Sequence, residues 1–139
     1  MTGGPGICPT LLYDDAKAAI ATLKDAFGFS EIAVYEADDG TVLHAELGFG
    51  SGVVMLGSRR REGVFAKAMA NAGPVGCYVV VEGGPAALDA HHARAAAHGV
   101  EILMGPADQD YGSRDYLARD AEGNVWSFGT YAPGAAEEG

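Results

Sequence analysis

The chain has 139 residues, of which 48% are hydrophobic and 20% are charged. This composition is typical of one globular domain that can bury a core, and its two cysteines are too few for a disulfide framework. The net charge of −10 argues against nucleic acid or an anionic membrane as partners, because both bind clustered lysine and arginine. No apolar run is long enough for a transmembrane helix and the N-terminus does not resemble a secretory signal, so we expect a cytoplasmic protein.

The first half of the chain predicts a strand, a helix and three more strands. Residues 7–13 are apolar and are followed by two aspartates, either of which can cap a helix. The helix has an apolar face at helical spacing and ends at Gly28, which suits a left-handed cap. Glycine-containing turns separate the strands that follow. These strands are predicted over residues 31–37, 41–49 and 52–57.

The same order of elements is predicted again in the second half. A connector over residues 58–75, with a short helix, leads to a buried strand at 77–82. A second long helix begins near Pro85 and ends at Gly99. A strong turn signal at residues 120–123 joins the last two strands. The strands after the helix are predicted over residues 100–104, 114–119 and 124–131.

This repetition predicts an α+β fold built from two β-α-β-β-β modules. Cys8 and Gly28 are separated by nearly the same number of residues as Cys77 and Gly99, which supports a duplication. An ordinary α+β domain without a duplication is the alternative. We expect one domain over residues 1–131 and a disordered tail at 132–139. Within the domain, module one is expected at about 7–57, the connector at 58–75 and module two at about 76–131.

Three segments of the sequence carry a family resemblance. These segments are CPTLLYDDAKAAIATLKDAFGF, VLHAELGFGSGVVMLG and YGSRDYLARDAEGNVWSFGTY. The first begins at residue 8 and the last ends at residue 131, so the resemblance extends over nearly the whole chain. They resemble the vicinal-oxygen-chelate superfamily of glyoxalases, bleomycin-resistance proteins and dioxygenases. The resemblance implies a curved mixed sheet with a central cup, helices outside and the ligand inside. It does not imply one reaction, because the superfamily contains several classes of enzyme and also drug binders without catalytic activity.

The resemblance also implies where a metal would be bound. Enzymes of the superfamily hold a divalent metal with His and Glu side chains from the first and last strands of each module, and these positions fall on Cys8, Met55, Cys77 and Ser127. None of the four offers the imidazole or carboxylate that Mg²⁺, Mn²⁺ or Fe²⁺ prefers, so we expect no such metal. A soft metal held by Cys8, Cys77 and Met55 is an alternative, but we favour sulfur-containing side chains that simply fill space.

One predicted strand carries the most informative polar residues. Alternation places the odd-numbered residues from Leu43 to Phe49 toward the helices, and Val42, His44 and Glu46 toward the cup. His44 and Glu46 are roughly 7 Å apart along the backbone, close enough to share a ligand. The pair could bind a polar group, or His44 could act as a general base oriented by the carboxylate. A solvated or interface face is the structural alternative.

The second module supplies further candidates through the family pattern. The resemblance implies that Arg114 and Tyr116 face the cup, with Tyr111 at its mouth, where aromatic rings of drug-binding relatives stack on planar ligands. Because Ser127 takes a metal-facing position, Trp126 should face the helices. Three histidines of the second helix are expected to be exposed: His91, His92 and His98.

Taken together, these patterns favour a metal-free protein that binds a small organic molecule, with an antibiotic as one candidate ligand. The predicted ligand-binding residues are His44, Glu46, Met55, Tyr111, Arg114 and Tyr116. Two alternatives remain open: a metal-dependent lyase or dioxygenase with His44 and Glu46 as displaced ligands, and a metal-independent enzyme with His44 as acid or base. We predict no cofactor, and we expect a homodimer, because modules of this superfamily pair within one chain or between two.

Overall fold

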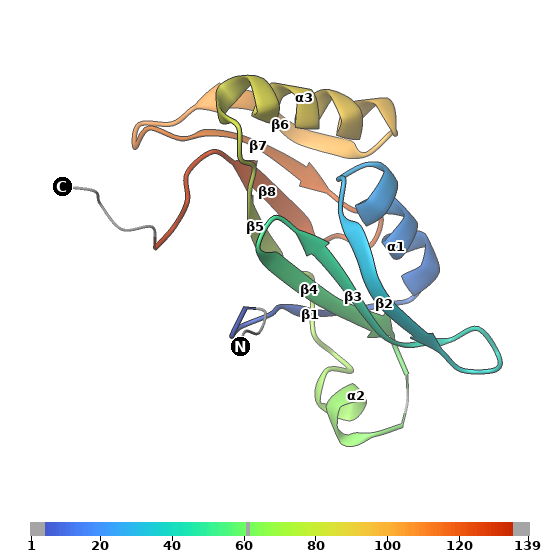
Figure 1. The fold of residues 1–139 in the computed structure, drawn as a ribbon. Coiled ribbons are helices and arrows are strands. Elements are labelled where there is room, and N and C mark those ends of the chain that lie inside the picture. The colour runs from blue at the N-terminus through green and yellow to red at the C-terminus, as the bar shows by residue number, and fades with distance from the viewer. Residues whose placement is uncertain (1–4, 61, 135–139) are drawn as a thin grey trace.

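The computed structural model describes residues 5–60 and 62–134, and it contains the two expected modules (Figure 1). Module one comprises β1 (Thr10–Tyr13), α1 (Ala16–Asp25), β2 (Ser30–Glu36), β3 (Val42–Phe49) and β4 (Gly52–Ser58). Module two comprises β5 (Gly76–Val80), α3 (Gly84–Ala97), β6 (Glu101–Asp108), β7 (Arg114–Arg119) and β8 (Val125–Gly129). The short helix α2 (Val64–Ala68) lies in the connector. The predicted α+β fold with two β-α-β-β-β modules is confirmed.

Each module forms its own four-stranded sheet. The strand order is β1-β4-β3-β2 in the first sheet and β5-β8-β7-β6 in the second. In both sheets the strand before the long helix pairs in parallel with the last strand, and the other pairs are antiparallel. The common strand order is what a duplication of one unit produces. None of the helices in the described parts of the chain is both long and apolar enough to cross a membrane.

Local sequence explains where α1 begins and ends. The Asp15 carboxylate accepts a hydrogen bond from the backbone N–H of Ala18 at 3.1 Å and so caps the first turn. Ile20 and Leu23 lie on the buried face of the helix. The chain leaves the helix at Gly28, whose φ of 78° lies in the left-handed region that glycine adopts without strain.

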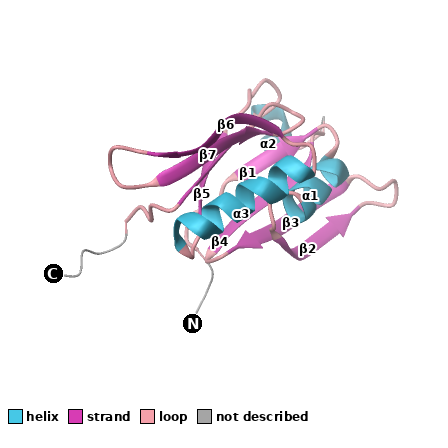
Figure 2. Cartoon of the chain, turned by 90° about the horizontal axis from the view of Figure 1, so that it is seen from above, coloured by secondary structure: helices cyan, strands magenta, loops and turns pink. Residues whose placement is uncertain are grey.

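Helix α1 packs against sheet one and helix α3 against sheet two, and the two helices contact each other (Figure 2). Arg94 of α3 donates hydrogen bonds to the backbone carbonyls of Asp25 and Lys24 at the end of α1, at 2.9 and 3.2 Å. One hydrophobic core contains residues of both helices and both sheets. At its centre the Phe27 ring lies 4.8 Å from that of Phe128, and both side chains are fully buried. Each sheet therefore covers the core with one face and turns its other face away.

We call the face that looks away from this core the open face of each sheet. On sheet one it carries Glu46 and Met55, which are register partners, whereas Leu56 faces the core and is 2% exposed. On sheet two it carries Tyr78 and Ser127, which are also register partners. The two open faces lie on opposite sides of a shared core, so within one chain they do not bound a common cup.

Two strands depart from the predicted pattern. Val42 is buried and Leu43 is 42% exposed, the reverse of the expectation, because the pairing of β2 with β3 is irregular beside them. Such a bulge shifts the alternation by one residue. Strand β6 continues past residue 104 through Pro106 to Asp108. Proline is tolerated there because β6 is the edge strand of its sheet.

Candidate functional site

The open face of sheet one brings together the candidates that were predicted in module one. The Nε2 atom of His44 lies 2.8 Å from the Oε2 atom of Glu46, and the two side chains are 40% and 36% exposed. Met55 is the cross-strand neighbour of Glu46. Tyr35 of β2, which the sequence pattern did not single out, stacks on His44 with ring centroids 6.0 Å apart. A hydrogen-bonded histidine–carboxylate pair thus lies between an aromatic ring and a thioether.

The hydrogen bond to Glu46 decides what the imidazole can offer a ligand. When Nε2 of His44 carries the proton and donates to the carboxylate, Nδ1 remains an acceptor for a hydroxyl or N–H group. The carboxylate also fixes the orientation of the ring. This arrangement can bind a polar group of a ligand, and it can also move a proton.

The predicted candidates of module two do not share one face. Tyr116 is fully buried on the helix side of β7, and its hydroxyl lies 2.7 Å from Nδ1 of His91. Arg114 also lies on the helix side, where its Nε donates to Asp89 of α3 at 2.8 Å. The prediction that Arg114 and Tyr116 face the cup is therefore wrong. The register explains this, because Tyr116 pairs with Phe128 and shares its core-facing side.

His91 is a structural residue between the modules and not an exposed one. Its Nε2 lies 2.7 Å from the backbone carbonyl of Phe27, which can only accept, so Nε2 carries a proton and Nδ1 accepts from the Tyr116 hydroxyl. Burial lowers the pKa of His91, although the hydrogen bond to Phe27 opposes this shift. His92 is also partly buried, against the Tyr116 ring, whereas His98 is exposed as predicted.

The four positions implied for a metal do not converge within one chain. Met55 and Ser127 lie on different open faces, and Cys8 precedes β1. Cys77 is the register partner of Trp126 and packs against the core, where burial raises the pKa of its thiol. The expectation that Cys77 points inward with the others is wrong, and Tyr78 takes the open-face position instead. The confirmed burial of Trp126 follows from the same register.

The donor chemistry at these positions does not fit the divalent metal of the superfamily's enzymes. Met55 offers a thioether and Ser127 a hydroxyl, and both are poor ligands for hard cations. Within one chain, Cys77 on a core face and Met55 on an open face do not bring their sulfur atoms together for a soft metal. In residues 5–60 and 62–134, no three His, Cys, Asp or Glu side chains gather in a way that could hold a metal ion.

The open face of sheet two carries a second cluster of polar residues. The Tyr111 hydroxyl donates to Oδ2 of Asp115 at 2.8 Å, and the Ser113 hydroxyl donates to Oδ1 of Asp115. Tyr78 and Tyr131 lie beside them, joined by a hydrogen bond from the Tyr78 hydroxyl to the Tyr131 carbonyl at 2.8 Å. We call these five residues the tyrosine–aspartate cluster. Of these five residues, the sequence predicted only Tyr111 as a candidate. Asp115 could have been found, because it is two residues from Leu117 in β7 and so lies on the same face, and Leu117 pairs with Ser127 of the open face.

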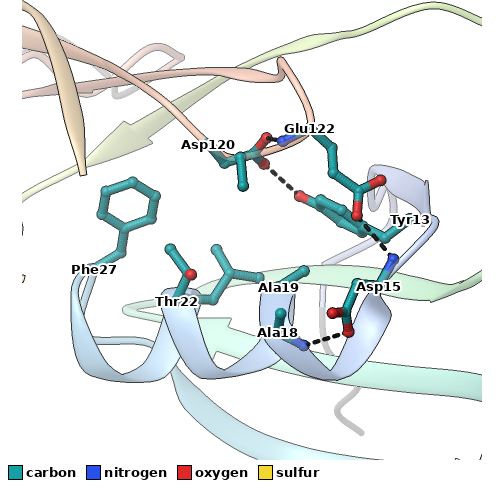
Figure 3. A pocket seen from close by; sticks show the side chains of 10 residues that line it. Tyr13, Asp15, Ala18, Ala19, Thr22, Phe27, Asp120 and Glu122 are labelled. Atoms are coloured by element: carbon teal, nitrogen blue, oxygen red, sulfur yellow. Dashed lines mark hydrogen bonds between the residues drawn. The ribbon is translucent and has the colours of Figure 1, made fainter. Parts of the chain in front are cut away.

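Among the cavities lined by described residues of both modules, two bear on ligand binding. One of about 130 Å³ lies between α1 and the β7–β8 turn, where Tyr13 points toward Asp120 (Figure 3). It is smaller than the pockets that bind drug-sized ligands, which have volumes of about 300–1,000 Å³. The other, of about 340 Å³, lies between the start of β4 and β5 and has a largely apolar lining that includes Phe49, Val53 and Tyr78. We call this second cavity the β4–β5 cleft.

Comparison with known proteins places this fold. The model of the Glyoxalase/Bleomycin resistance protein/Dioxygenase superfamily matches residues 9–128. The chain belongs to this superfamily. The fold is similar to TioX from Micromonospora sp. ML1, with 29% identity and a TM-score of 0.75 over 93% of this chain and 100% of TioX. The superfamily membership confirms the resemblance that the three sequence segments carry.

Two more distant superfamily structures agree in fold alone. A glyoxalase/bleomycin resistance protein/dioxygenase from Nocardioides is 21% identical, with a TM-score of 0.64 over 100% of this chain and 93% of that protein. A lactoylglutathione lyase from Agrobacterium tumefaciens is 20% identical, with a TM-score of 0.63 over 90% of this chain and 93% of that protein. The comparison with curated proteins found no match.

Proposed function

We propose that the chain binds a small organic molecule on the open faces of its sheets without a metal ion. The observation that carries this proposal is the hydrogen-bonded pair His44–Glu46, which stays more than one third exposed between Tyr35 and Met55. A few directed polar groups on an apolar and aromatic surface are typical of small-molecule sites. The donor chemistry at Met55 and Ser127, which suits no hard cation, supports the absence of a metal.

A second copy of the chain would complete this site. An open sheet face leaves one side of a ligand in water, whereas drug-sized ligands are mostly buried when bound. The open faces carry large exposed aromatic side chains, including Tyr35 (59%) and Tyr111 (60%), and aromatic residues are enriched in protein interfaces. Light scattering should therefore find a homodimer. A monomer at the concentrations used for binding would contradict this part of the proposal.

Sequestration of an antibiotic is one form that this function can take. The description of the matching superfamily includes bleomycin resistance. A protein that holds a drug lowers its free concentration by mass action and needs no catalytic group. The acidic composition, with a net charge of −10, would attract a cationic drug at long range.

The hydrogen bond between His44 and Glu46 favours one second candidate, a metal-independent enzyme. A histidine oriented by a carboxylate is a common arrangement for proton transfer, and His44 would then act as acid or base. Turnover of a bound ligand would distinguish this enzyme from a binding protein.

Thermal unfolding of chelator-treated protein with a panel of organic compounds and with divalent metals tests the proposal. A ligand present at a hundred times its Kd stabilises a protein by about 2.7 kcal/mol, so an organic ligand should raise the Tm in the presence of EDTA. His44→Ala and Glu46→Gln should each weaken its binding by about ten-fold, the effect of losing one charge-assisted hydrogen bond. His98→Ala changes an exposed histidine and serves as the matched control.

The outcomes separate the three functions. Stabilisation by a divalent metal but by no organic compound would contradict the proposal in favour of a metalloenzyme. Conversion of the ligand by the wild type but not by His44→Ala would identify the metal-independent enzyme. Unchanged affinity in both open-face variants would remove the His44–Glu46 pair as the site.

A further inference from the structure

The tyrosine–aspartate cluster contains a carboxylate without a cationic partner. Asp115 is only 6% exposed, and both of its oxygens accept hydrogen bonds from neutral hydroxyl groups. None of the ion pairs between described residues includes Asp115. The adjacent Arg114 points to the other side of β7, where it pairs with Asp89 and Asp108. A buried carboxylate is costly without a partner of opposite charge, so a cation that reaches it is stabilised.

Gly129 lets this cluster assemble. A Cβ atom added at Gly129 would overlap both the Asp115 carboxylate and the Tyr78 hydroxyl, so these groups lie directly over this position. The rings of Tyr111 and Tyr131 meet edge to face, with centroids 5.6 Å apart. Three tyrosines therefore gather around one carboxylate on the open face of sheet two.

This combination of groups is complementary to an organic cation. The face of an aromatic ring carries partial negative charge and attracts ammonium and guanidinium groups. A carboxylate accepts about four hydrogen bonds, and the two hydroxyl donors leave acceptor positions on Asp115 for N–H groups. The hydrogen bond to Asp115 also raises the pKa of Tyr111, which keeps its hydroxyl protonated as a donor.

The cluster also adjoins an apolar space. Tyr78 belongs both to the cluster and to the lining of the β4–β5 cleft of about 340 Å³. Phe49 and Val53 contribute apolar surface to the same cleft. A ligand with one cationic end and one apolar end can therefore contact the tyrosine–aspartate cluster and the β4–β5 cleft at the same time.

We propose that the tyrosine–aspartate cluster binds the cationic nitrogen of an organic ligand whose apolar body occupies the β4–β5 cleft. This inference rests on the proposed binding function and adds the class of ligand. It fails by itself if the chain binds only uncharged molecules, in which case the proposed function still holds. Its tyrosines and carboxylate belong to module two, whereas His44 and Glu46 lie on sheet one, so variants can test the two groups of residues separately.

NMR titration of protein labelled with ¹³C-tyrosine tests this inference on the full chain. The probes are choline, its uncharged isostere 3,3-dimethylbutan-1-ol, and benzyltrimethylammonium, which adds an apolar ring. The protein has six tyrosines, and Tyr→Phe variants assign their signals. We expect both cations to shift the signals of Tyr111 and Tyr131 in a saturable way. Choline should bind about ten-fold more tightly than its isostere, and benzyltrimethylammonium more tightly than choline.

Variants of the cluster test the role of the carboxylate. Asp115→Asn should weaken the binding of both cations by about ten-fold or more, because it removes the negative charge that attracts a quaternary ammonium group without a hydrogen bond. Asp110→Asn removes the same charge from an exposed position in the β6–β7 loop, which precedes the strand that carries Asp115, and should leave binding unchanged. If Asp115→Asn does not fold, as judged by circular dichroism, Tyr111→Ala and Tyr131→Ala replace it, because the two side chains are 60% and 47% exposed. Either of these variants should also weaken cation binding.

Three results would overturn the inference. The first is equal binding of choline and its isostere, or no saturable binding of either cation. The second is an equal effect of Asp115→Asn and Asp110→Asn, which would indicate only long-range attraction to an acidic protein. The third is loss of the dimer in Asp115→Asn with unchanged cation affinity, which would assign the carboxylate to the contact between two copies of the chain.

Discussion

Replacing Asp120 with asparagine should weaken the contact between the two modules and lower the stability of the fold. Asp120 lies in the β7–β8 turn of module two, and its Oδ2 accepts a hydrogen bond from the Tyr13 hydroxyl of module one at 2.7 Å (Figure 3). The same oxygen also accepts a hydrogen bond from Nε1 of Trp126 at 3.0 Å. Its Oδ1 accepts from the backbone N–H groups of Glu122 and Asn124, both at 3.0 Å. One carboxylate therefore holds the turn together and ties it to β1.

The expected loss of stability follows from the burial of the two side-chain donors. Tyr13 is 1% exposed and Trp126 is fully buried, so neither donor can turn to water when its acceptor is lost. In Asp120→Asn the amide NH₂ group replaces Oδ2 if Oδ1 keeps its backbone partners. Each hydrogen bond to a charged group contributes about 1.5–3 kcal/mol, so the variant should lose roughly 3–5 kcal/mol. A typical domain has a total stability of about 5–15 kcal/mol.

Urea unfolding measures this loss, followed by circular dichroism and by the fluorescence of the single tryptophan. Trp126 lies at the site of the change and reports on it directly. Asp38→Asn is the control, because Asp38 is exposed in a turn and should cost less than about 0.5 kcal/mol. Combining Asp120→Asn with Tyr13→Phe should show a coupling energy above about 0.5 kcal/mol, because the two side chains share a hydrogen bond.

Two results would refute this reasoning. A loss below about 1 kcal/mol in Asp120→Asn would mean that the buried donors find other partners. Additive effects of Asp120→Asn and Tyr13→Phe would mean that the hydrogen bond between the modules contributes little to stability.

Three further predictions follow from the structure. Gly129→Ala should lose about 1–3 kcal/mol of stability in urea unfolding, because its Cβ atom overlaps two side chains. A Gly129→Ala protein as stable as the wild type would contradict this close approach. Gly76→Ala is the control, because its Cβ atom meets only one backbone oxygen, at 3.9 Å. His91 has a lowered pKa in the folded state, so the unfolded chain takes up the proton first and stability should fall as the pH drops below the ordinary value of 6.5 and stay constant above it. This pH dependence, measured by urea unfolding at several pH values, should shrink in His91→Gln and persist in His98→Gln, and the opposite pattern would show that another group titrates. Tyr116→Phe should lose about 0.5–1.5 kcal/mol by removing one hydrogen bond and leave ligand affinity unchanged, whereas weaker binding would return Tyr116 to the site.

Much of the fold could be predicted because short sequence patterns mark the ends and the order of its helices and strands. Asp15 and Gly28 mark the ends of α1, and the repeated order of elements predicts the duplication. The His44–Glu46 pair could be predicted because β3 alternates regularly at these residues and one face is clearly apolar. Tyr35 was missed because its contact with His44 depends on cross-strand register, which the sequence of one strand does not contain.

The errors in module two have a common physical cause. Strand β5 has apolar residues on both faces, so its sequence does not reveal which side Cys77 takes. Helix α3 has 14 residues and α1 has 10, so the two modules differ in length. Counting residues across the helix therefore does not show which residues of module two lie on the same sheet face as their counterparts in module one. For Tyr116, the hairpin closed by Asp120 and Asn124 fixes its pairing with Phe128. Once Phe128 is assigned to the core, that register would have placed Tyr116 there too.

The most direct test of metal-free ligand binding on an open face uses the methyl signals of the methionines. Met55 lies on the open face of sheet one beside Glu46, whereas Met69 lies at the end of α2 in the connector. In protein labelled at its methionine methyl groups and kept in EDTA, an organic ligand that raises the Tm should shift the Met55 signal at the same Kd and leave Met69 unmoved. A Met55 signal that shifts only after a divalent metal is added, or not at all while the ligand binds, would contradict the account.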